Sequence, residues 1–153
     1  MEIVKFPNDI LRQKAVKVEE ITDEIIKISE DMLFLMRLNG GIGLAANQVG
    51  ILKRIIVVDT TVSDTKNGFQ GIMINPEIIG TTAVEKILTE GCLSFPKQIR
   101  LIKRPFGVKV KFFDKNKKQQ VIFFAELTAR VILHEMDHLD GKLFIDYANN
   151  NRI

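Results

Sequence analysis

The chain has 153 residues, a length typical of one domain, and its 46% hydrophobic and 27% charged residues disfavour disorder, collagen and coiled coil. The net charge of +3 is too small to indicate a polyanionic partner by itself, and the lone cysteine, Cys92, excludes an internal disulfide. From the length we expect a single domain (residues 1–153). No stretch approaches the ~20 apolar residues that span a bilayer, so we expect no membrane contact and a location in the cytoplasm.

The first 22 residues predict an irregular arm, without the basic start and apolar run of a signal peptide. Thr22 can cap a helix whose first turn carries Asp23 and Glu24, and Asn39-Gly40-Gly41 ends that helix. Its core-facing stripe has helical spacing and comprises Ile25, Ile28, Met32, Leu35 and Met36.

Strand candidates follow this helix. The short, mostly apolar run Arg54–Asp59 predicts a strand, and the polar segment Thr60–Gly71, with its Asn67-Gly68 pair, predicts a loop. Further strands are expected over residues 72–79 and 84–89.

The segment 97–118 is strongly basic, with nine Lys or Arg residues and one acidic residue, Asp114. Within it Val108, Val110 and Phe112 alternate with lysines, which indicates a strand with one face exposed to solvent. Residues 107–113 and 119–125 are predicted to form a hairpin. The favoured interpretation of the basic residues is a solvated hairpin, and the alternative is a surface that meets an acidic partner.

A second helix is predicted over Glu126–Leu139, ended by Asp140-Gly141. Strands clustered around two helices favour an α+β fold over a regular βαβ repeat.

This second helix carries H-E-M-D-H at 134–138, which holds both histidines of the chain. On a helix, His134 and His138 lie on one face and can bind one metal ion, while Glu135 can handle the proton of a water on that metal. The alternative is a pair of surface histidines without a function.

An open metal site needs a third protein ligand. No glutamate follows His138, and Phe144 stands where the metzincin pattern has its third histidine, so the ligand is expected upstream. Cys92 is the best candidate, because a thiolate suits Zn²⁺ or Fe²⁺; the alternative is a small buried hydrophobic residue.

The segment 41–48, G-I-G-L-A-A-N-Q, superficially matches a dinucleotide-binding fingerprint. The match is disfavoured because it follows a predicted helix, whereas the fingerprint follows a strand. Its glycines allow close approach to a ligand, and Gln48 offers an amide donor for an oxyanion, although a plain loop is an equally good interpretation of the segment alone.

Together, G-I-G-L-A-A-N-Q at 41–48, E-G-C-L-S at 90–94 and H-E-M-D-H at 134–138 resemble peptide deformylase, in the order of that family. The resemblance implies a metal-dependent hydrolase that removes the N-formyl group from the initiator methionine of nascent polypeptides. It also implies a compact α+β domain, mostly antiparallel strands around a central helix that carries the histidine motif. The implied ligands are Cys92, His134 and His138, holding Fe²⁺, with Zn²⁺ or Ni²⁺ able to substitute.

The same resemblance implies roles for residues around the metal. Glu135 would accept the proton of the attacking water, and the Gln48 amide and the Leu93 N–H would stabilise the oxyanion. A pairing of Glu90 with Arg104 is a further hypothesis. The residues implied in substrate binding are Gly43 and Gly91 through their backbones, and Ile42, Leu88, Leu127 and Val131 as the lining of a methionine pocket.

Expected partners are formyl-methionyl nascent peptides, and we expect a monomer. Family members often carry a helix after the Asp-Tyr pair that is associated with ribosome docking, but only six residues follow Tyr147 in this sequence, so a weak ribosome contact is expected through residues 97–118. The alternatives are a metallopeptidase of another lineage that shares H-E-x-x-H, and a non-catalytic metal-stabilised or RNA-binding module.

Overall fold

The computed structural model describes residues 1–147, and the expectation about the segment after Tyr147 lies outside them. The helices are α1 (Asp23–Leu38) and α2 (Glu126–Leu139), and 3-10 helices span Asp9–Arg12, Ala46–Val49 and Phe144–Asp146. The strands are β1 (Gly43–Ala45), β2 (Ile55–Asp59), β3 (Gln70–Thr81), β4 (Glu85–Cys92), β5 (Phe95–Pro105), β6 (Gly107–Phe113) and β7 (Gln119–Ala125).

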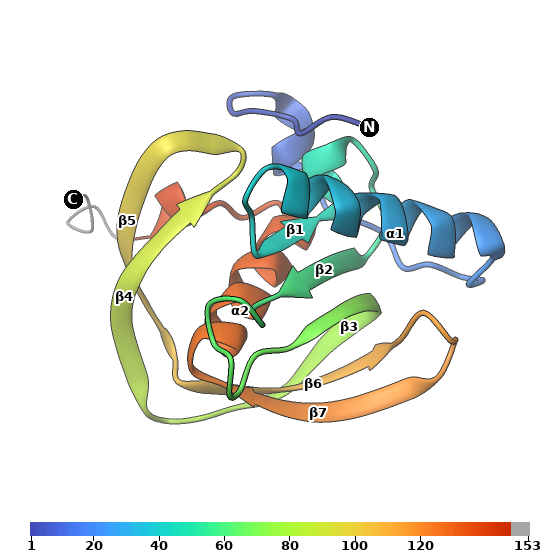
Figure 1. The fold of residues 1–153 in the computed structure, drawn as a ribbon. Helices are drawn as coiled ribbons and strands as arrows, with labels where there is room; N and C mark the ends of the chain where they lie inside the picture. Colours follow the sequence, from blue (N-terminus) through green and yellow to red (C-terminus); the bar gives the residue numbers. More distant parts are fainter. Residues whose placement is uncertain (148–153) are drawn as a thin grey trace.

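The strands form two antiparallel sheets (Figure 1). Five strands pair in the order β1-β2-β3-β6-β7, and β4 and β5 pair with each other as a long curved ribbon. This is the α+β fold with mostly antiparallel strands that the sequence predicted.

The apolar run of β2 is buried on both faces of the five-stranded sheet. Ile55 and Val57 belong to the core cluster that contains the inner face of α1, whereas Ile56 and Val58 belong to the cluster that contains α2. This double burial explains why the strand shows no alternation of apolar and polar residues.

Several predicted elements are confirmed. The Thr22 hydroxyl accepts a hydrogen bond from the Ile25 N–H at 3.3 Å and caps α1. The hairpin of β6 and β7 has the predicted bounds, and Val108, Val110 and Phe112 are buried while Lys109 points outward. α2 also has its predicted bounds.

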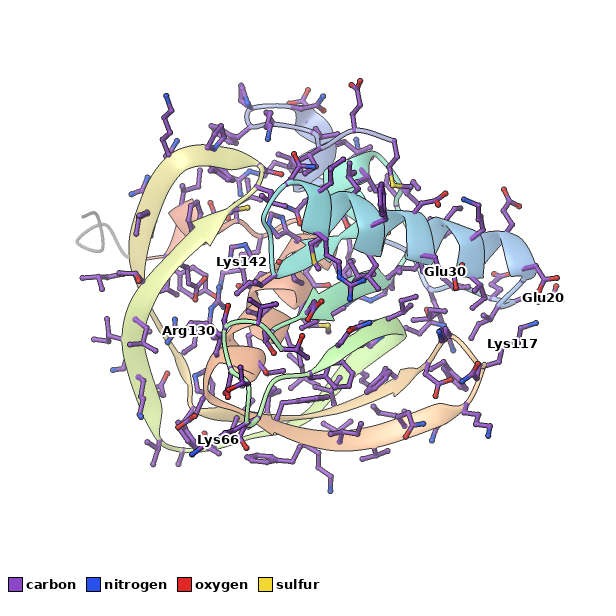
Figure 2. The ribbon with its side chains drawn as sticks, viewed as in Figure 1. Glu20, Glu30, Lys66, Lys117, Arg130 and Lys142 are labelled. Carbon is purple, nitrogen blue, oxygen red and sulfur yellow. The ribbon has the colours of Figure 1, made fainter. Side chains whose placement is uncertain are left out.

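The sequence analysis missed β5, because its basic residues obscure the strand pattern. The structure divides the basic segment between β5 and the β6–β7 hairpin, whose tip carries Lys117 (Figure 2). Arg104 is one of the nine basic residues that the sequence analysis counted in this segment. It is only 3% exposed and therefore belongs to the interior.

α2 lies between the five-stranded sheet and the β4–β5 ribbon (Figure 1), and 11 of its 14 residues are buried. It ends before Gly141, which has φ +72° and packs against the Arg12 backbone, so that a β-carbon would collide there. Neither of the helices described here combines the length and apolarity that crossing a bilayer requires.

Candidate active site

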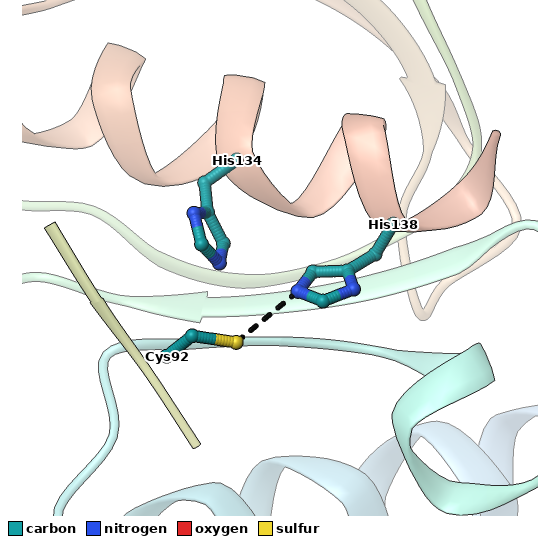
Figure 3. A group of neighbouring side chains, drawn as sticks. All are labelled: Cys92, His134 and His138. Atoms are coloured by element: carbon teal, nitrogen blue, oxygen red, sulfur yellow. Dashed lines mark hydrogen bonds between the residues drawn. The ribbon is translucent and has the colours of Figure 1, made fainter. Parts of the chain in front are cut away.

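Three side chains that could hold a metal ion converge from two distant parts of the chain. Cys92 lies at the end of β4, and His134 and His138 lie one turn apart on α2 (Figure 3). The Cys92 sulfur and one ring nitrogen of each histidine all lie within 4.8 Å of one another. The structure thus brings together the three residues that the sequence analysis grouped.

The spacing of these atoms fits a shared divalent ion. The Cys92 Sγ and the His138 Nε2 are 3.3 Å apart (Figure 3), close to the ~3.5 Å between a sulfur and a nitrogen ligand on one tetrahedral zinc ion. The buried His138 Nδ1 has no hydrogen-bond partner among the described residues. A thiolate with two imidazoles is a donor set that suits Zn²⁺ or Fe²⁺.

Glu90 fixes the orientation of His134. Its Oε1 lies 2.8 Å from the His134 Nδ1, which leaves the Nε2 of that ring for the metal site. The same carboxylate accepts hydrogen bonds from Arg104 at 2.5 and 2.9 Å and from Arg130 at 2.7 Å. The hypothesis of a Glu90–Arg104 pair is therefore confirmed, with Arg130 as a second partner.

The Arg104 guanidinium extends this network to Asp137 of α2 and to Tyr147. Its Nη1 donates to Asp137 and to the Tyr147 hydroxyl, each at 3.0 Å, and that hydroxyl donates to Asp137. The sequence analysis missed Arg130, Asp137 and Tyr147 as parts of the site. Arg130 and Asp137 had a usable signal, because they lie four residues before and three residues after His134 on the same helix face.

The surroundings favour positive charge between Glu90 and Cys92. Burial lowers the pKa of His134, but hydrogen bonds to Cys92 and Glu90 outweigh burial and raise the pKa to about 10. Burial and the neighbouring His134 hold the pKa of His138 well below its usual range. A positive charge is therefore stabilised at this point, and either a metal ion or a proton can supply it.

Glu135 is buried next to His134 in the chain, and burial raises the pKa of its carboxyl to about 7. Its Oε2 has no hydrogen-bond partner among the described residues. Gly43 of β1 passes so close that a β-carbon there would lie 2.6 Å from the Glu135 Oε1. The absence of a side chain at Gly43 therefore makes room for the carboxylate.

Gln48 and Leu93 lie on either side of Cys92. The Gln48 Nε2 is 3.6 Å from the Cys92 sulfur and donates to the Ser94 hydroxyl at 3.1 Å, while its Oε1 accepts from the Ala45 N–H. Leu93 occupies the turn between β4 and β5. The segment 41–48 is a strand followed by a 3-10 helix.

A cavity of about 630 Å³ opens beside these groups. Of the predicted substrate-binding residues, its lining includes Ile42, Gly43, Gly91, Leu127 and Val131. Leu88 is not part of the lining. It is 48% exposed on β4, and its role in the methionine pocket stays a prediction.

Comparisons with known proteins identify the family of this chain. The family model of polypeptide deformylase matches residues 1–152. The peptide deformylase of Thermoanaerobacter pseudethanolicus is 44% identical over 94% of this chain and 86% of its own length. That of Rickettsia canadensis is 42% identical over 98% of this chain and 88% of its own.

Solved structures show the same fold. Peptide deformylase from Ehrlichia chaffeensis in complex with actinonin gives a TM-score of 0.93 at 35% identity, covering 98% of this chain and 89% of that one. A probable peptide deformylase from Synechococcus phage S-SSM7 gives a TM-score of 0.89 at 40% identity, covering 97% of this chain and 99% of that one.

Proposed function

The chain belongs to the polypeptide deformylase family and is an enzyme that removes the N-formyl group from nascent polypeptides, and we propose that Cys92, His134 and His138 hold the metal ion for this reaction. The observation that carries the assignment is their convergence within 4.8 Å beside the buried Glu135.

The proposed metal is Fe²⁺, with Zn²⁺ or Ni²⁺ able to substitute, because the site offers one thiolate and two imidazoles. When bound, a divalent ion supplies Lewis-acid chemistry, polarising the formyl carbonyl and making water a stronger nucleophile. Elemental analysis of anaerobically purified protein identifies the ion.

Glu135 is the proposed proton carrier. A carboxyl with a pKa of about 7 can both accept and release a proton near neutral pH. In the proposed sequence Glu135 accepts a proton from the water that attacks the formyl carbon, and then delivers it to the amine nitrogen as the C–N bond breaks and formate leaves.

Gln48 and Leu93 are the proposed donors to the oxyanion. The Gln48 amide and the Leu93 N–H flank the Cys92 ligand, where negative charge develops on the formyl oxygen. Gly43 and Gly91 are proposed to contact the peptide backbone, and Ile42, Leu88, Leu127 and Val131 to bind the methionine side chain.

Formate release from formyl-Met-Ala-Ser, with Fe²⁺ and without oxygen, tests these roles. Glu135→Ala is expected to bind metal normally and to lose at least ~10²-fold in kcat, because the proton carrier is absent. Cys92→Ala is expected to lose the metal. Glu30→Ala, at an exposed position of α1, serves as the control with unchanged activity and metal content. A Glu135→Ala enzyme as active as the unmodified protein would contradict the assignment.

We also propose that the chain acts as a monomeric single catalytic domain in the cytoplasm, where nascent polypeptides are made, and makes a weak ribosome contact through the basic segment 97–118. Within it, exposed Lys115, Lys117 and Lys118 at the tip of the β6–β7 hairpin are suited to ribosomal RNA. Charge reversal at these three lysines is expected to reduce co-sedimentation with ribosomes; unchanged co-sedimentation would exclude the contact.

A further inference from the structure

The mouth of the catalytic cavity is positively charged. Among the described residues, six Lys, Arg, His or Glu side chains line this cavity. Four of them, Glu90, Arg130, His134 and Glu135, are buried, and Glu90 binds both Arg130 and His134. The two exposed ones, Lys5 and Lys97, are both basic, so a substrate that enters the cavity meets their charge first.

Lys97 is held at the mouth by an unusual backbone conformation. It lies near the start of β5 with φ 63°, a left-handed value that costs energy for a residue with a side chain. Among the described residues, Lys97 forms neither a salt bridge nor a side-chain hydrogen bond. Its ammonium group is therefore available to a ligand.

Lys5 adds a second fixed charge from the N-terminal arm. Its Nζ donates to the Leu93 carbonyl oxygen at 2.7 Å, and the neighbouring backbone groups of Val4 and Phe6 donate to the carbonyls of Gln48 and Ser94. These bonds tie the arm to the segments that flank Cys92. The Lys5 charge is thereby held next to the site, with two ammonium hydrogens left for other partners.

On the premise of the proposed function, we propose that Lys97, supported by Lys5, makes the enzyme prefer formyl-methionyl peptides with an acidic side chain at the first or second residue after methionine. The reacting group and the methionine side chain occupy the buried part of the cavity, so the following residues pass its mouth. There an aspartate gains Coulomb attraction that an asparagine of the same shape does not.

Matched peptide pairs test the preference, with Asp or Asn at each of the two positions after formyl-methionine. At low salt the unmodified enzyme is expected to favour Asp by roughly threefold to tenfold in kcat/KM at one of the positions, mainly through KM. The ratio is expected to fall toward one at high salt, because ions screen exposed charges.

Variants assign the preference to a residue. Lys97→Met is expected to bring the Asp-to-Asn ratio close to one, and Lys97→Glu to favour a Lys-containing peptide instead. Lys66→Met, which removes an equal charge from the exposed loop between β2 and β3 (Figure 2), is expected to keep the ratio. A ratio of one or less in the unmodified enzyme, or a full ratio in Lys97→Met, would overturn the proposal. Turnover of the Asn peptides separates that outcome from a failure of the deformylase assignment, in which no formyl peptide reacts.

Discussion

Glu90, two residues before the proposed ligand Cys92, connects several residues of the site. Its carboxylate accepts from two buried guanidinium groups and contacts a proposed metal ligand, His134. Burial raises the pKa of Glu90, but the hydrogen bonds from His134 and Arg104 lower it to about 2, so the group is ionised at neutral pH. The charge of one residue thus offsets Arg104 and Arg130 in the interior.

Replacing Glu90 by Gln is expected to lower the free energy of unfolding by about 3–5 kcal/mol, because the buried Arg130 loses its counter-charge and the buried Arg104 keeps only Asp137. Urea unfolding measures this loss. Glu85→Gln, at an exposed position of the same strand, is expected to change stability by less than ~0.5 kcal/mol. Equal stability of the Glu90→Gln and unmodified proteins would show that this hydrogen-bond network does not stabilise the folded protein.

At the scale of secondary-structure elements, the close approach of β1 to α2 shapes the site. A β-carbon at Gly43 would lie 2.6 Å from both the Glu135 Oε1 and the Val131 Cγ1. A side chain at Gly43 would therefore force Glu135 and Val131 to move.

Gly43→Ala is expected to reduce kcat/KM by about 10- to 100-fold while the protein stays folded, because the added methyl group displaces the Glu135 carboxylate. Formate-release kinetics and circular dichroism separate the two effects. Gly80→Ala is the matched control, since its β-carbon would meet Lys109 at an ordinary 3.8 Å. A fully active Gly43→Ala enzyme would mean that the packing relaxes without moving Glu135.

At the scale of the whole molecule, an ion pair joins the outer helix layer to the sheet. The Arg37 guanidinium at the end of α1 donates to Asp59 at the end of β2, at 2.7 and 2.8 Å. Burial raises the pKa of Asp59, but hydrogen bonds from Thr61 and Arg37 outweigh it and lower the pKa. The stabilisation is therefore present above the unfolded pKa, and it is lost as pH falls through the lower, folded value.

We expect Asp59→Asn to lower the free energy of unfolding by roughly 1 kcal/mol at pH 7. The difference between the two proteins is expected to shrink as pH falls below ~4, because the native carboxylate becomes protonated. Urea unfolding at pH 7, 4 and 3 measures the trend. A difference that stays constant across this range would assign the effect to shape rather than to charge.

The sequence by itself determined several of the helices and strands and the residue types of the proposed metal ligands. Some features depend only on residues that are close in sequence: the cap at Thr22, the alternation in residues 107–113 and the four-residue spacing of His134 and His138. Such features can be predicted from the sequence. The peptide deformylase motifs supplied the reaction class.

Only the tertiary structure decided which distant groups meet. It made a strand of residues 95–105 and buried Arg104 and Arg130 around Glu90. It also brought Lys5 of the N-terminal arm to the turn after Cys92. These contacts form because the β4–β5 ribbon curves over α2. Contacts between residues that are distant in sequence produce no periodic pattern of residue types, so the sequence alone does not predict them.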